Sequence, residues 1–92
     1  MKEAGSIWVF NGVQANFPSG IFSARELAEA WILKYRLTGT LTEYPLDVGM
    51  YDYSISKGFF TPKKEEHQTS LFIGKFTDGG MQHFHFEDGL LG

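Results

Sequence analysis

A single helical stripe between residues 24 and 35 most constrains how this chain can fold. Ser23 and Glu26 have the spacing of a capping box, which predicts that a helix begins there. The apolar residues that follow recur at the spacing of one helical face: Ala24, Leu27, Ala28, Trp31 and Tyr35. Gly39 predicts a left-handed stop a few residues later. We therefore expect an amphipathic helix over about residues 24–37, and the rest of the chain must supply a surface that covers its apolar face.

Four other segments have the β-branched, aromatic or alternating character of strands: residues 7–10, 13–17, 40–44 and 81–87. Asn11-Gly12 is the pair typical of a type I′ turn, so it predicts that the first two strands form a hairpin. The last segment alternates strictly, which places Phe84 and Phe86 on one face. Together these patterns predict a four-stranded sheet.

Two shorter helices are expected between the third and fourth strands. The first is predicted over residues 47–57 with Asp47 as its cap, and the second begins at Thr69 or Ser70. The predicted fold class is α+β: a four-stranded, mainly antiparallel sheet with the element order β-β-α-β-α-α-β and a single layer of helices on one face. The length of 92 residues suits one core, so we expect a single domain over residues 1–92, with residues 1–6 as a flexible tail.

Composition excludes several classes of function. The formal net charge is −3, so the chain lacks the basic surface through which proteins hold nucleic acid. It has no cysteine, which excludes disulfides and thiolate metal sites. No apolar run precedes Ile7, and none approaches the length of a membrane span. We therefore expect a cytoplasmic protein whose partners are neither nucleic acid nor membrane.

The most distinct chemical pattern is a row of potential metal ligands in the last strand. His83, His85 and Glu87 project to the same face, and imidazole and carboxylate groups bind divalent metals such as Zn²⁺. The alternative is an ordinary solvated strand face, which we favour because the remaining histidine, His67, lies in a charged loop. No cofactor is predicted. No catalytic residue is predicted either, because the chain lacks cysteine and a G-x-S-x-G elbow, so an enzyme is the less favoured interpretation.

Aromatic residues are abundant, with nine Phe, four Tyr and two Trp. Trp8 and Phe10 lie opposite Ile7 and Val9 on the first predicted strand, so both faces of that strand are apolar. Either helices cover both faces, or Trp8 and Phe10 contact a protein partner or a second copy in a homodimer. A second candidate is an aromatic and acidic surface that suits a basic protein partner: Tyr44, Asp47, Tyr51, Asp52 and Tyr53.

Several segments also resemble those of a known family of short bacterial proteins, classified only as a domain of unknown function. The resemblance covers nearly the whole chain and rests on these segments: Trp8 to Gly12 (WVFNG), Phe17 to Phe22 (FPSGIF), Leu37 to Asp47 (LTGTLTEYPLD), Tyr51 to Tyr53 (YDY), Phe60 to Lys63 and His83 to Glu87. It implies bacterial origin and no particular activity. In size and acidity alone, the chain is also similar to immunity proteins that neutralise toxic enzymes, which is an analogy.

We therefore expect a non-catalytic bacterial protein that binds a protein partner, or itself, through an aromatic and acidic surface. The alternative is a small metal-binding or ligand-binding protein, or an enzyme, that uses the face of His83, His85 and Glu87.

Overall fold

The computed structural model of the chain describes residues 5–77 and 80–92, which form two compact units. The sheet unit comprises residues 1–46 and 81–92, and the helical unit comprises residues 47–80. The expected single domain over residues 1–92 stays a prediction. Of the expected flexible tail, residues 1–4 lie outside the described residues, and Ser6 is the first residue of a strand.

The sheet unit is built on one antiparallel sheet, as the sequence predicted, but the sheet has five strands instead of four. In the order β2-β1-β3-β4-β5, the strands are β2 (Gly20–Phe22), β1 (Ser6–Gly12), β3 (Gly39–Pro45), β4 (His83–Glu87) and β5 (Leu90–Leu91). The additional strand exists because Asp88 and Gly89 both adopt positive φ angles, 51° and 86°, and turn the chain back after β4. Asp-Gly is a typical type I′ turn pair.

The predicted turn at Asn11-Gly12 is wrong. Both residues continue β1, where Asn11 pairs with Thr40 and Gly12 with Gly39. The N–H of Val13 then donates to the carbonyl of Thr38, so pairing with the chain before β3 extends past the expected turn. Residues 13–17 do not form a strand, and β2 begins only at Gly20.

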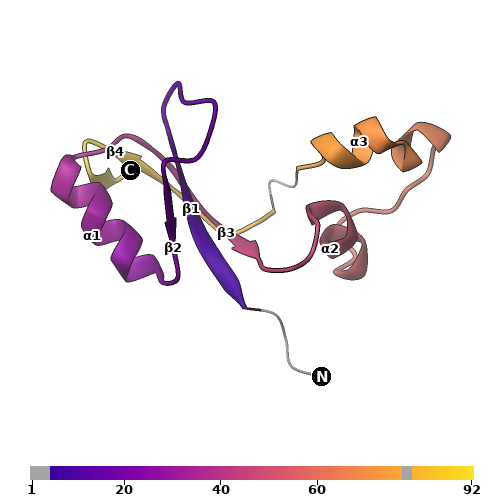
Figure 1. Cartoon of the computed structure of the whole chain (residues 1–92), viewed down its shortest axis with the longest axis horizontal. Helices are drawn as coiled ribbons and strands as arrows, with labels where there is room; N and C mark the ends of the chain where they lie inside the picture. The colour runs from indigo at the N-terminus through magenta and orange to yellow at the C-terminus, as the bar shows by residue number, and fades with distance from the viewer. Residues whose placement is uncertain (1–4, 78–79) are drawn as a thin grey trace. The chain divides into compact units, whose positions relative to one another are not determined.

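Helix α1 (Arg25–Tyr35) confirms the predicted helix and corrects both of its ends. Its N-cap is Ala24, which makes no side-chain capping bond, so Ser23 and Glu26 do not form the expected capping box. The left-handed residue at its C-terminus is Arg36, with φ 52°, and not Gly39, which pairs in β3. Figure 1 shows α1 beside the strands of the sheet unit.

The core of the sheet unit lies between α1 and one face of the sheet. Residues directly opposite each other in an antiparallel pair share a face. Phe10 pairs with Leu41, and Leu41 pairs with Phe84, so these side chains lie on the same face as Trp8. The buried cluster joins this face to α1: Trp8, Phe10, Ala28, Ile32, Leu41 and Phe86. One helix thus covers the rings of β1 within the sheet unit.

The helical unit contains α2 (Met50–Ser56), a 3₁₀ helix η1 (Glu65–Gln68) and α3 (Ser70–Lys75). Thr69 caps α3 as predicted, since its hydroxyl accepts from the N–H of Phe72 at 3.2 Å. Asp47 does not cap α2: the N-cap is Gly49, and Asp47 has φ 63°. The described helices include none with the length and apolar character needed to cross a membrane.

Candidate functional site

Five rings of the helical unit pack together and form what we call the aromatic cluster: Tyr51, Phe60, His67, Phe72 and Phe76. The ring centroids of Phe60 and Phe76 are 4.9 Å apart, and those of His67 and Phe72 are 4.8 Å apart. Tyr51 meets Phe76 edge-on at 5.6 Å. At such separations, aromatic pairs contribute a stabilising interaction in addition to the effect of burying their apolar area.

Local hydrogen bonds position the rings of this cluster. The Thr69 hydroxyl caps α3 and also donates to the carbonyl of Glu66, which fixes η1 against the start of α3. Phe72 and Phe76 are four residues apart, so their rings project from the same side of this segment. The carbonyl of Ser54 in α2 accepts from the N–H groups of Phe59 and Phe60, at 2.8 Å and 3.3 Å. These bonds hold the end of α2 and the two following phenylalanines together.

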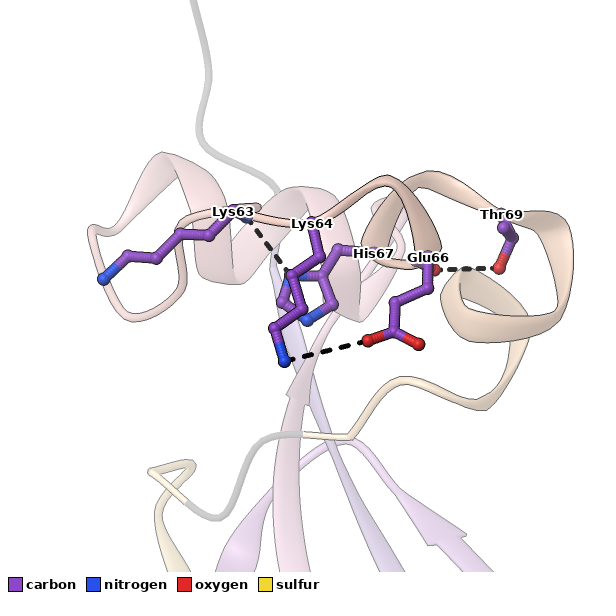
Figure 2. A network of polar contacts seen from close by, with 5 residues as sticks. All are labelled: Lys63, Lys64, Glu66, His67 and Thr69. Atoms are coloured by element: carbon purple, nitrogen blue, oxygen red, sulfur yellow. Dashed lines mark hydrogen bonds and ion pairs between the residues drawn. The ribbon is translucent and has the colours of Figure 1, made fainter.

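His67 joins the aromatic cluster to a polar network (Figure 2). Its Nδ1 accepts a hydrogen bond from the N–H of Lys63 at 3.2 Å, so in this arrangement the ring proton sits on Nε2. Lys64 and Glu66 approach to 3.9 Å, but both side chains are about 70% exposed, and such pairs contribute little to stability. His67 therefore orders the loop before η1 while its ring packs on Phe60 and Phe72.

A groove of about 620 Å³ opens beside the aromatic cluster. It is lined by Phe59, Phe60, Glu66, Thr69, Leu71, Phe72, Lys75, Phe76 and Thr77. Phe59 is 57% exposed and Leu71 is 72% exposed, so the groove is open at its side and is not an enclosed cavity. Four of its nine lining residues are phenylalanines, and Glu66 and Lys75 supply one charge of each sign. We call this site the aromatic groove.

Within the helical unit, the rings of the aromatic cluster are only half-buried. Among the described residues of the helical unit, only Ser54 is buried. The sheet unit, in contrast, has a closed core of its own. An apolar surface that stays accessible within its own unit is a candidate for contact with another molecule.

The residues predicted as binding sites have different positions. Trp8 and Phe10 are 8% and 1% exposed, so in this conformation neither ring offers surface to a partner. Tyr51 belongs to the aromatic cluster, and Tyr53 packs on Phe59 with centroids 6.5 Å apart. The remaining residues of the predicted acidic surface are Tyr44, in β3 of the sheet unit, and the exposed Asp47 and Asp52 of the helical unit.

None of the nine residues that line the groove was predicted as a site. Leu71, Phe72 and Phe76 follow the predicted helix start at Thr69 or Ser70, and apolar residues at such positions are equally typical of a core. The available signal was Phe59-Phe60, two large rings directly before a charged loop.

The predicted metal row is only partly brought together. His83 and His85 are both exposed on β4, with ring centroids 5.2 Å apart. In the described part of the chain, no three His, Cys, Asp or Glu side chains are grouped so that they could hold a metal ion. Glu87 therefore does not complete a three-ligand site with the two histidines.

The sequence model of one protein family matches residues 7–92, and that family is described as Domain of unknown function (DUF7710). The match confirms the resemblance to a domain of unknown function over nearly the whole chain. No curated protein and no solved structure matches the chain.

Proposed function

We propose that this chain, which belongs to the family Domain of unknown function (DUF7710), is a non-catalytic protein. It binds a protein partner through the aromatic groove of its helical unit. The observation that carries this proposal is the groove itself, which is lined in part by aromatic surface that the helical unit leaves accessible. Large aromatic side chains concentrate binding energy in protein interfaces.

The shape of the groove favours a segment of a protein over a small molecule. Clefts and cavities that hold small molecules bury about 70–90% of the ligand surface. Here Phe59 and Leu71 stand at the open side and are more than half exposed. A partner that lies across the groove covers both residues and inserts an apolar side chain between them and Phe72.

The charges at the groove define the expected partner further. Glu66 and Lys75 both line it, and the Lys64–Glu66 pair is loose enough to exchange for a contact with a partner. We expect an aromatic or long aliphatic anchor residue flanked by polar or charged groups. A second copy of the chain is one candidate partner, and a bacterial cytoplasm with an immunity-like role is one setting for such a protein.

Peptide selection tests this proposal without a known partner. Peptides are selected from a random displayed library on the immobilised full chain, and their affinity is measured for Leu71→Asp and Leu27→Asp. Both leucines are exposed near the start of a helix, Leu71 in α3 at 72% and Leu27 in α1 at 57%. Only Leu71 lines the groove. Since an unpaired charge in the contact opposes binding, we expect Leu71→Asp to weaken it at least about tenfold, the equivalent of 1.4 kcal/mol.

We expect Leu27→Asp to change the affinity less than about twofold, since surface substitutions outside a contact have small effects. Equal losses in the two variants, or peptides that bind Leu71→Asp as well as the unchanged protein, would place the binding surface elsewhere. Sedimentation of the free protein adds a second readout: a dimer that Leu71→Asp dissociates identifies the partner as another copy of the chain.

A further inference from the structure

We propose that His83 and His85 form a chelating site for a divalent transition-metal cation, with Zn²⁺ as the ion to test first. The two residues are two positions apart along β4, so their rings project from the same face of the sheet. Both side chains are exposed, which leaves room for the ion and for the water it keeps. This site belongs to the sheet unit and is independent of the aromatic groove.

The spacing of the rings fits a shared tetrahedral ion. Zn²⁺ binds imidazole nitrogen at about 2.0–2.1 Å, which places the centroids of two such rings about 5 Å apart at a tetrahedral angle. The observed centroid separation is 5.2 Å. The rings are also nearly perpendicular, at 89°, so they do not stack on each other.

A hydrogen bond at Nδ1 of His83 leaves its other ring nitrogen, Nε2, available to bind an ion. His83 Nδ1 lies 2.7 Å from the carbonyl oxygen of Met81. A carbonyl oxygen can only accept, so the ring proton is on Nδ1 and the lone pair is on Nε2. Metal-binding histidines usually donate their second ring N–H in this way, which orients the ring and raises the basicity of the ligand nitrogen.

A side chain offers His85 a partner for the same tautomer. Its Nδ1 lies 3.3 Å from the hydroxyl oxygen of Thr40, its direct partner on β3, and that oxygen can accept the proton. Thr42, the corresponding partner of His83, makes no contact of this kind, because His83 Nδ1 is bound to Met81. Thr40 is therefore a positioning residue for His85, and Thr42 provides a matched control.

The site has two protein ligands, since the described residues offer no third one in reach. Water or an incoming ligand completes the coordination at two positions, whereas catalytic zinc sites with three protein ligands leave one such position. Imidazole pairs suit Zn²⁺, Cu²⁺ and Ni²⁺ better than Mg²⁺ or Ca²⁺, which prefer oxygen ligands. The competing interpretation is that His83 and His85 are two solvated side chains that do not share an ion. It predicts that removing one ring leaves the affinity of the other for the metal unchanged.

Calorimetric titration of the tag-free full chain with Zn²⁺ separates these interpretations. We expect one ion per chain, and a loss of affinity of at least tenfold in either His83→Asn or His85→Asn. His67→Asn, which removes the remaining histidine, should leave the affinity within twofold. Absence of saturable binding to the unchanged protein, or equal binding by the double variant His83→Asn with His85→Asn, would overturn the proposal.

A second pair of variants tests the geometry. Thr40→Val removes the acceptor for His85 Nδ1 while valine keeps a β-branched side chain suited to a strand. We expect a loss of affinity of about tenfold, the lower end of the effect of such supporting hydrogen bonds. Thr42→Val should change the affinity less than twofold. Equal effects of the two substitutions would show that the hydroxyl of Thr40 does not position a ligand, and would contradict the proposed site.

Discussion

Replacement of Gly39 by alanine is expected to lower the free energy of unfolding by about 3 kcal/mol or more, the upper end of the cost of overpacking. A Cβ atom at this position would collide with the carbonyl oxygen of Asn11. It would also lie 2.7 Å from Cζ of Phe10 and 2.8 Å from Cα of Gly12. Two of these three neighbours are backbone atoms of β1, which pairs with β3, so they cannot move without disturbing the ladder.

The direct strand partner of Gly39 supplies the control. A Cβ atom at Gly12 would meet only ordinary contacts, at 3.8 Å and 3.9 Å, so Gly12→Ala should change stability by about 0.5 kcal/mol or less. Urea unfolding followed by tryptophan fluorescence measures both variants, since both tryptophans, Trp8 and Trp31, lie in the sheet unit. Similar midpoints for Gly39→Ala and the unchanged protein would refute the close approach of β1 and β3.

The second large effect is expected for Phe72→Ala in the helical unit. The ring of Phe72 packs on four others of the aromatic cluster: Tyr51, Phe60, His67 and Phe76. Full burial of a phenylalanine makes its loss cost about 3–5 kcal/mol, so for this half-buried ring we expect about 2 kcal/mol. Amide hydrogen exchange should accelerate in α3, and peptide binding at the groove should be lost with its wall.

Leu71→Ala is the matched control for Phe72→Ala. It places the same alanine one residue earlier in α3, but Leu71 is 72% exposed and its removal leaves the five rings in contact. Amide exchange in α3 should therefore stay within about 0.5 kcal/mol of the unchanged protein. If the two substitutions accelerate exchange equally, the aromatic cluster does not stabilise the helical unit.

Local patterns predicted the secondary structure correctly where interactions within a single element determine its conformation. The stripe ending at Tyr35 depends on spacing within one helix, and α1 forms over it, although Leu27 and Tyr35 of the stripe are each 57% exposed. The hairpin turn depended on a competition that no local pattern reveals. Asn11-Gly12 and Asp88-Gly89 have the same turn chemistry, but pairing of β1 with β3 holds the first pair extended, and only the second pair turns.

The candidate site shows a similar limit. The sequence left open whether helices or a partner cover Trp8 and Phe10, and α1 packs on their face and buries both. Phe72 and Phe76 had the pattern of a core helix, yet they border an open groove. An apolar face has the same sequence whether another element covers it or not, because burial is set by contacts between distant residues.

Site-specific photo-crosslinking in the source cells tests the central claim, that the aromatic groove binds a protein partner. Benzoylphenylalanine is placed at Leu71, which lines the groove, or at Leu27, an exposed leucine of α1. On irradiation we predict one discrete, heavier adduct from position 71, which disappears when Phe72→Ala is added, and no such adduct from position 27. The same adducts from both positions, or none from position 71, would contradict the account.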